Sequence, residues 1–470
     1  MRQKLRRCAA ILLCAALLSA PTLTQSAAAA QTAPRVRDVW IDKARHNPGE
    51  QVSVVASATP GAVVRFSLVQ LGTPITQGQV VAGADSRAVW NVVAPPRDHM
   101  GYMVHADAGE TKATTALDVS SDWTTFPRMG YLDSYPLGMT AAEQQGMLLQ
   151  LSRRYHLNSL QFYDWMWRHE KPIPKGDLPA TWTGWNGDVI APQTVKSLAQ
   201  RAKKLGMAPL PYSMSYAALQ GFDSHGVAPG WRLKYASTGA DWKFLMYADD
   251  PRTALWMMDP SNQNWVSHMQ AEYRAQIQQM GFEGTHLDQL GNWGGAADGG
   301  MTTAAGKRVD LPVALAGMVD TTRRSTGRPA GLNAVDGFGA KQLAESASTY
   351  LYSELWERNE TWTRLQSYVN KQRLDSGGKP AVIAAYANNK HLSGITSEAE
   401  LGTRSGVSTN TNHTGFTGSG FVDQFGDPGD EVTLTFDAPE SRRYGIVPKW
   451  SNHTSQTAWR TVLVLSLIHI

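Results

Sequence analysis

Two acidic residues lie in short runs whose composition suits acid–base chemistry. Asp288 stands in the run GTHLDQLG (residues 284–291) and Glu354 stands in YLYSELW (residues 350–356). Both runs contain β-branched or aromatic residues, so each acid is expected at the carboxyl end of a strand. Cleavage of a glycosidic bond requires two such groups, because one protonates the leaving oxygen while the other attacks or stabilises the anomeric carbon. A lone buried Asp is more often structural, so the prediction depends on both acids facing each other.

The sequence leaves the stereochemistry of such a reaction open. A retaining enzyme holds its two carboxyl groups ~5–5.5 Å apart, and an inverting enzyme holds them ~6.5–9.5 Å apart to admit a water. A metal-dependent hydrolase would instead need clustered histidines. The histidines at 156, 169, 286 and 391 are scattered singly, and no HExxH pair occurs. We therefore expect catalysis without a cofactor.

Aromatic residues gather near the expected strand ends. The run YDWMW (residues 163–167) follows one strand, and Trp182 and Trp185 lie on the loop after it. The chain has 16 Trp and 15 Tyr against 11 Phe, a bias toward amphipathic aromatic side chains. Such rings stack on the apolar C–H faces of a pyranose. About half of these aromatics should instead pack the loops against the fold, so only some are candidates for sugar contact.

The elements that must position these residues alternate between strand and helix after Trp123. A capping box at residues 140–143 begins a helix expected to end at 155, and further helices are expected at 193–205 and 264–279. Seven strands are expected, at residues 129–133, 159–163, 208–213, 284–290, 329–334, 350–355 and 381–386. This order predicts a (β/α)8 barrel catalytic domain over residues 124–392, whose catalytic groups come from the carboxyl ends of the strands. An eighth strand is not visible, so the barrel is expected to be incomplete.

Two further β-rich regions flank the expected barrel. Residues 36–121 predict an N-terminal immunoglobulin-like β-sandwich, with strands at 51–56, 63–71, 88–93, 102–106 and 114–119. It contains no catalytic constellation and is expected to have a packing or positioning role. Residues 396–464 predict a second β-sandwich inserted late in the barrel, with strands at 431–436, 444–450 and 459–464.

The last six residues, LSLIHI (465–470), match the translation of a common sequencing adapter. We therefore expect the natural chain to continue past Val464. The alternative is a native apolar strand. Because a barrel without its eighth strand has an open edge, the chain as written is expected to be poorly soluble or inactive.

The N-terminal segment and the composition predict a secreted protein. Residues 1–30 combine four basic residues, a short apolar stretch and an Ala-rich end, which predicts a secretory signal peptide. Without it, the 44 basic residues fall to 40 and equal the 40 acidic residues, so no basic surplus remains to attract nucleic acid or membrane. Both cysteines, Cys8 and Cys14, lie in this segment. With 42% hydrophobic and 18% charged residues, we expect a folded, secreted monomer without disulfides.

Four motifs in order resemble glycoside hydrolase family 66, the endo-dextranases and cycloisomaltooligosaccharide glucanotransferases, over about residues 36–390. They are GYLDSYP (130–136), FYDW (162–165), GTHLDQLG (284–291) and YSELW (352–356). The resemblance implies retention of configuration and action on α-1,6-glucan. It implies Asp288 as the nucleophile and Glu354 as the general acid/base, with Glu357 as a competing acid outside the motif. It also implies sugar contacts from Tyr163, Asp164, Trp165, Tyr212, His286, Gln289, Asn333 and Trp356.

The C-terminal region resembles carbohydrate-binding module family 35. The resemblance rests on EAE (398–400), NTNHTG (410–415), GFVDQFG (420–426) and GD (429–430). It implies a structural Ca²⁺ held by Glu398 and Glu400, because carboxylate oxygens suit that cation. The alternative is that these are two solvated acids. Trp450 and Asn452 are the expected sugar contacts of the module.

The sequence ranks three functions. Dextran hydrolysis comes first, because it is the broader class. Cyclisation of α-1,6-glucan by transfer within one chain comes second, since water and a sugar hydroxyl compete for the same glucosyl-enzyme. A non-catalytic α-glucan-binding protein comes last, because both acids stand in intact motifs.

Overall fold

The computed structural model describes residues 33–245, 253–292, 300–356, 362–385, 397–413, 416–427 and 429–435. Several expected features lie outside these ranges: the signal peptide, Glu357, Trp450, Asn452, both strands expected after residue 440, and residues 465–470. The chain divides into two compact units. No helix in the described part of the chain is long and apolar enough to cross a membrane.

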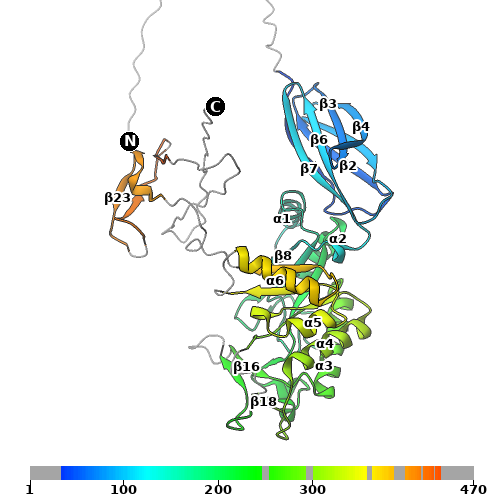
Figure 1. The fold of residues 1–470 in the computed structure, drawn as a ribbon, viewed down its shortest axis with the longest axis vertical. Coiled ribbons are helices and arrows are strands. Elements are labelled where there is room, and N and C mark those ends of the chain that lie inside the picture. The colour runs from blue at the N-terminus through cyan, green and yellow to red at the C-terminus, as the bar shows by residue number, and fades with distance from the viewer. Residues whose placement is uncertain are drawn as a thin grey trace, which may run out of the picture. The chain divides into compact units, whose positions relative to one another are not determined.

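The N-terminal region forms two antiparallel sheets (Figure 1). Alternating residues of the strands are buried, and Val52, Val54, Val64, Phe66 and Val104 belong to the core between them. One sheet has the order β1-β2-β5 and the other β4-β3-β6-β7. The bounds are β1 Val36–Ile41, β2 Gln51–Ala58, β3 Val63–Gln70, β4 Thr73–Val81, β5 Arg87–Val93, β6 Met100–Ala108 and β7 Thr111–Val119.

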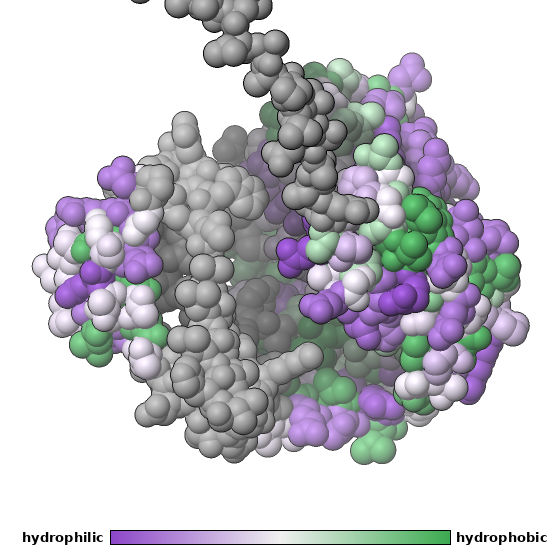
Figure 2. All heavy atoms as spheres, turned by 90° about the horizontal axis from the view of Figure 1, so that it is seen from above, coloured by the Kyte–Doolittle hydropathy of each residue, from purple (hydrophilic) through white to green (hydrophobic). Residues whose placement is uncertain are grey.

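All five strands expected in this region are present, and two others were missed. The sequence of β4, TPITQGQVV, has few apolar residues, and none of its residues is fully buried, because it lies at the edge of its sheet. Strand β1 is short, and two charged residues interrupt its apolar pattern. Figure 2 shows hydrophilic and hydrophobic side chains interspersed over the described surface that it presents.

The second unit is built on parallel strands in chain order. Five of them form one sheet with the order β8-β9-β12-β17-β19, and β20 and β21 form a parallel pair. A parallel bridge between Asn333 and Tyr352 joins the end of β19 to β20. All seven expected strands are therefore present, in the expected order. Their bounds are β8 Met129–Leu132, β9 Ser159–Phe162, β12 Ala208–Met214, β17 Thr285–Asp288, β19 Ala330–Leu332, β20 Leu351–Leu355 and β21 Ala381–Ala385.

Helices separate most of these strands. The predicted capping box is confirmed: the backbone N–H of Thr140 donates to Glu143, and that of Glu143 donates to the Thr140 hydroxyl. Helix α4 packs against β19, and α6 packs against β21. The bounds are α1 Ala141–Arg153, α2 Pro192–Lys204, α3 Gln263–Met280, α4 Leu311–Thr326, α5 Ala340–Glu345 and α6 Trp362–Asp375.

A closed (β/α)8 barrel is not present among the described residues. Among the described residues, strand β8 pairs only with β9, and β21 pairs only with β20. Both β8 and β21 are therefore open edge strands. The sequence also missed a small antiparallel sheet between β12 and α3, with the order β13-β16-β15. Its strands are β13 Ala217–Leu219, β15 Lys243–Leu245 and β16 Ala254–Met257.

Four short strands make up the described part of the C-terminal region. Strand β22 (Thr403–Ser405) pairs with β25 (Glu431–Thr433), and β23 (Ser408–Asn410) pairs with β24 (Phe421–Asp423), both antiparallel. Strand β25 coincides with the start of the strand expected at 431–436. Two isolated pairs do not establish a sandwich, so the family 35 module stays a prediction.

Gly331 tests the packing inside the second unit. A Cβ added at Gly331 would lie 2.5 Å from two ring carbons of Tyr350, which is fully buried and stacks on His286. We expect Gly331→Ala to lower the free energy of unfolding by about 2 kcal/mol, because the ring cannot move freely. Gly101→Ala is the control, since nothing lies within 4 Å of its added Cβ. Denaturant unfolding measures both, and equal effects would contradict this packing.

Candidate active site

The two predicted acids meet at the carboxyl ends of neighbouring strands. Asp288 ends β17, Glu354 lies near the end of β20, and Asn333 directly follows β19 between them. The Asn333 Nδ2 donates to Asp288 Oδ1 at 2.9 Å and to Glu354 Oε2 at 3.1 Å. Two oxygens at these distances from one nitrogen can be no more than about 6 Å apart. The strand order therefore brings two acids that are 66 residues apart in the sequence to one place.

Hydrogen bonds hold each acid in place. The Tyr212 hydroxyl donates to Asp288 Oδ2 at 2.8 Å, and the backbone N–H of Gln289 donates to Oδ1 at 2.8 Å. The backbone N–H of Glu354 donates to Asn333 Oδ1 at 2.9 Å. Parallel pairing of β12 with β17, which places Met214 beside Asp288, brings the Tyr212 side chain within reach.

Burial raises the pKa of Asp288 to about 6. The hydrogen bond from Tyr212 opposes this rise, and the nearby Glu354 charge adds to it. The hydrogen bonds from Gln289 and Asn333 act in the same direction as that from Tyr212. The carboxyl group is therefore ionised at neutral pH, as a nucleophile must be, and becomes protonated in mildly acidic solution.

Aromatic side chains and a third acid lie beside the pair. Tyr163, 38% exposed, follows β9, and its ring centroid lies 4.3 Å from that of Tyr212. Asp164 has a left-handed backbone (φ 48°) and accepts a hydrogen bond from Trp185 Nε1 at 2.9 Å. Burial raises the pKa of Asp164 to about 6, and the Trp185 hydrogen bond opposes this rise. Trp356, 46% exposed, follows β20.

The family model described as glycosyl hydrolase family 66 matches residues 41–437. The chain belongs to this family. A cycloisomaltooligosaccharide glucanotransferase of Niallia circulans is 34% identical over 443 residues, which cover 89% of this chain and 45% of the relative. A dextranase of Streptococcus salivarius is 24% identical over 341 residues, covering 65% and 41%.

A solved structure of the same family resembles the fold. It is a cycloisomaltooligosaccharide glucanotransferase of Paenibacillus sp. complexed with cycloisomaltoheptaose, with a TM-score of 0.71 and 30% identity. The match covers 85% of this chain and 60% of that one. The chain spans about half the length of the curated relatives it matches.

His286 lies beneath the acids rather than beside an open surface. It stands two residues before Asp288 on the same face of β17, and its Nδ1 lies 3.2 Å from the Tyr350 hydroxyl. The Tyr352 ring meets it edge-on at 4.6 Å between centroids. Burial lowers the pKa of His286 to about 3, so the imidazole is neutral. These three side chains form a polar and aromatic floor under Asp288 and Glu354.

Two of the predicted sugar contacts are buried and make hydrogen bonds within the protein. Trp165 is fully buried, and its Nε1 donates to the carbonyl oxygen of Tyr212 at 3.3 Å. Its ring packs against Phe282, so no exposed face remains to stack on a sugar. Gln289 is buried, and its Nε2 donates to the carbonyl oxygens of Asn333 at 2.8 Å and Phe338 at 3.1 Å. Gln289 therefore fixes the chain that follows β19.

Sequence analysis missed one exposed aromatic at this site. Tyr131 on β8 is 66% exposed, and its ring centroid lies 6.3 Å from that of Tyr163. The signal was available, because Tyr131 belongs to the first family motif and to a strand whose neighbours carry the site. It extends the exposed aromatic surface from β9 to β8.

Buried polar contacts fix the loop that carries Asp164 and Trp185. Glu170 on this loop is fully buried, pairs with Arg168, and accepts the backbone N–H of Leu219 at 3.0 Å. The loop also reaches α3, where Glu272 accepts a hydrogen bond from Lys171 at 2.6 Å. These charged pairs therefore fix the loop after β9 against the elements that neighbour it.

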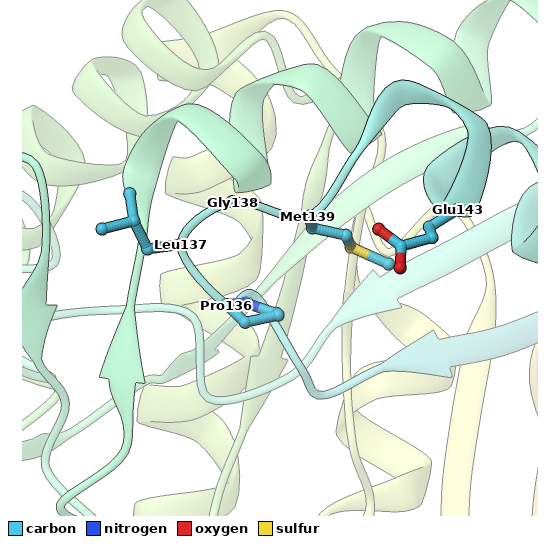
Figure 3. Close-up of a pocket in the computed structure, with 5 residues that line it drawn as sticks. All are labelled: Pro136, Leu137, Gly138, Met139 and Glu143. Atoms are coloured by element: carbon cyan, nitrogen blue, oxygen red, sulfur yellow. The ribbon is translucent and has the colours of Figure 1, made fainter. Parts of the chain in front are cut away.

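The hollow drawn in Figure 3 is separate from the acid pair. It has a volume of about 440 Å³ and is lined by Pro136, Leu137, Gly138, Met139 and Glu143, on the loop from β8 into α1. Its single acid, Glu143, is engaged in the capping box with Thr140. This hollow therefore carries no catalytic constellation.

The acids expected to bind calcium lie close together in the C-terminal region. Glu398 accepts a hydrogen bond from Thr417 at 3.0 Å, and Glu400 Oε1 accepts the backbone N–H of Ser419 at 2.8 Å. Among the described residues, the second oxygen of Glu400 is buried without a hydrogen-bond partner, which suits a cation. Calcium takes six to eight oxygen ligands. No group of three or more acidic, His or Cys side chains that could hold a metal occurs in the described ranges.

The raised pKa of Asp288 predicts a pH-dependent cost in stability. The native state binds a proton at Asp288 more tightly than the unfolded chain does. The contribution of Asp288 to the free energy of unfolding is therefore present below about pH 4 and is lost as the pH rises through about 6. We expect Asp288→Asn to remove this loss, so that its gain in melting temperature over wild type is larger at pH 7.5 than at pH 4.5. Asp85→Asn, an exposed position, is the control. A gain that is independent of pH would contradict the expectation.

Proposed function

We propose that the protein is a retaining enzyme that cleaves α-1,6-glucosidic bonds of dextran. Asp288 is the nucleophile and Glu354 is the general acid/base. The observation that carries this proposal is the Asn333 bridge, which limits the two carboxylate oxygens to about 6 Å of each other. That limit is compatible with the ~5–5.5 Å spacing of the carboxyl groups in retaining enzymes.

The reaction runs in two displacements. In the first, an Asp288 oxygen forms a bond to the anomeric carbon while the bond from that carbon to the leaving O6 breaks, and Glu354 gives its proton to O6. In the second, Glu354 takes a proton from an acceptor hydroxyl, whose oxygen attacks the same carbon. The bond to Asp288 then breaks, and the α configuration is restored.

Exposed groups around the acids supply the sugar contacts. Tyr163 offers exposed ring surface near Asp288 and Glu354, Tyr131 extends it, and Trp356, two residues after Glu354, is also exposed. The half-buried Asp164 offers a carboxylate to sugar hydroxyls. Tyr212 orients Asp288 through its hydroxyl. His286 completes the floor from below.

The acceptor decides the product. Sequence analysis ranks water first, but the glucanotransferase relatives match more of this chain at higher identity than the dextranase. We place cyclisation first on that ground, with the 6-hydroxyl at the far end of the same glucan chain as acceptor. Hydrolysis to linear isomaltooligosaccharides is the second candidate, supported by the dextranase relative.

Two further proposals concern the whole protein. The basic and apolar composition of residues 1–30 supports secretion. The orphaned Glu400 oxygen supports a structural Ca²⁺ in the C-terminal region, with Glu398 as a second ligand. In that role the ion stabilises the fold and takes no part in the reaction.

Product analysis tests the function. We expect a protein that contains this chain to convert dextran to oligosaccharides whose mass is one water lower than that of the linear series. Such masses identify cyclic sugars by chromatography and mass spectrometry. Linear products alone would assign a dextranase, and binding of dextran without any product would favour the non-catalytic alternative.

Reaction of two variants with azide tests which acid is the nucleophile and which is the general acid/base. We expect Glu354→Ala to lower kcat on dextran by about 10²- to 10⁴-fold, because the leaving O6 is no longer protonated. With an aryl α-isomaltooligosaccharide, which needs no such proton, azide should intercept the glucosyl-enzyme and give the α-glycosyl azide. Asp288→Gly with azide should instead give the β-glycosyl azide, since azide replaces the nucleophile on the opposite face.

Nuclear magnetic resonance of the anomeric proton distinguishes the two azides. Glu345→Ala, at an exposed position on α5, is the control and should leave kcat unchanged. The assignment of the two acids fails if both variants yield the same anomer.

A further inference from the structure

We propose that Asn333 is a positioning residue that stabilises each of the two acids in the step in which it is ionised. This inference rests on the proposed function and deepens it. It replaces the sugar contact that sequence analysis predicts for Asn333. The observation behind it is that one side-chain nitrogen donates to both carboxylates.

The Asn333 side chain has no N–H left for a sugar. An amide nitrogen carries two hydrogens, and those of Nδ2 are directed at Asp288 and Glu354. Its Oδ1 accepts the backbone N–H of Glu354. The residue is only 3% exposed. A sugar hydroxyl could accept a hydrogen bond from Asn333 only by displacing one of the two acids.

Backbone contacts hold Asn333 between the strands. Its backbone N–H donates to the carbonyl oxygen of Leu287 at 2.9 Å, and its own carbonyl oxygen accepts from Gln289 Nε2 at 2.8 Å. Leu287 and Gln289 flank Asp288 in the chain. The nucleophile and the residue that orients it are therefore locked to each other by three separate hydrogen bonds, one of them from the side chain of Asn333 to Asp288.

The two hydrogen bonds from Asn333 Nδ2 stabilise one acid in each displacement, without any movement of the Asn333 side chain. An N–H that donates to a carboxylate favours the ionised form and lowers the pKa of the acid. For Asp288 this hydrogen bond opposes the effect of burial. In the first displacement Asp288 is the anion. After Glu354 has given up its proton and Asp288 has become an ester, Glu354 is the anion, and the second hydrogen of Nδ2 already faces it.

Kinetics of Asn333→Ala and Asn333→Asp on dextran test the role in the complete gene product. Alanine removes the donor, and aspartate keeps the shape but replaces the donor with a third acid. We expect kcat to fall about 10- to 100-fold in Asn333→Ala, with KM changed less than about threefold. In the profile of kcat/KM against pH, the apparent pKa of the acid limb should be higher than in the wild type. The shift should be larger in Asn333→Asp, because a like charge adds to the lost hydrogen bond.

Asn91→Ala is the matched control. Asn91 lies on β5 of the N-terminal region, where its side chain accepts a hydrogen bond from Ser53, and its replacement should leave the pH profile unchanged. Circular dichroism and the melting temperature verify the fold of each variant. The near-isosteric Asn333→Asp keeps the test valid if the alanine variant does not fold.

Two outcomes would overturn the inference while leaving the proposed function intact. A raised KM with kcat and the acid limb unchanged would make Asn333 a sugar contact. Its role would be structural if both variants had a lower melting temperature and a lower kcat while the apparent pKa of the acid limb stayed unchanged. Failure of the proposed function is distinguishable, because the wild-type protein would then form no product from dextran.

Discussion

Asp288 and Glu354 each place one carboxylate oxygen within about 6 Å of the other, so the two groups repel each other when both are ionised, and the rest of the site is organised around this constraint. Burial favours the neutral form of Asp288, and hydrogen bonds from Tyr212, Gln289 and Asn333 favour the anion. The balance keeps Asp288 ionised at neutral pH, which the proposed double displacement requires of its nucleophile.

The parallel sheet satisfies the constraint through strand order. Strands β17, β19 and β20 are neighbours, so the side chains at their carboxyl ends reach one another whatever their separation in the sequence. Close packing beneath supports them, because Tyr350 lies where Gly331 has no side chain and stacks on His286. A rigid floor of this kind keeps the distance between Asp288 and Glu354 fixed, which loops alone could not do.

The sequence predicts the seven strands, and with them the proximity of Asp288 and Glu354, because the runs of residues that form each strand and its carboxyl end are local signals. It misplaces Trp165 for a physical reason. Asp164 takes a left-handed backbone conformation, which breaks the alternation of the preceding strand and turns the next side chain inward. The edge strand β4 and the small sheet between β12 and α3 were missed because their residues lack apolar alternation or depend on tertiary packing. The Asn333 bridge needs three strands, so no local pattern could reveal it.

In the proposed reaction, the acid pair by itself does not decide between water and a sugar hydroxyl, because both acceptors would meet the same glucosyl-enzyme and the same base. The choice depends on which acceptor reaches Glu354 first. In this proposal the exposed aromatic rings of Tyr131 and Tyr163 favour a sugar ring over water, since stacking offsets part of the free-energy cost of holding a chain end at the site. Transfer within one glucan chain gains further, because its far end is present at a high effective concentration. In this proposal cyclisation needs no additional catalytic group, only a bound chain long enough for its far 6-hydroxyl to return to the anomeric carbon that Asp288 holds.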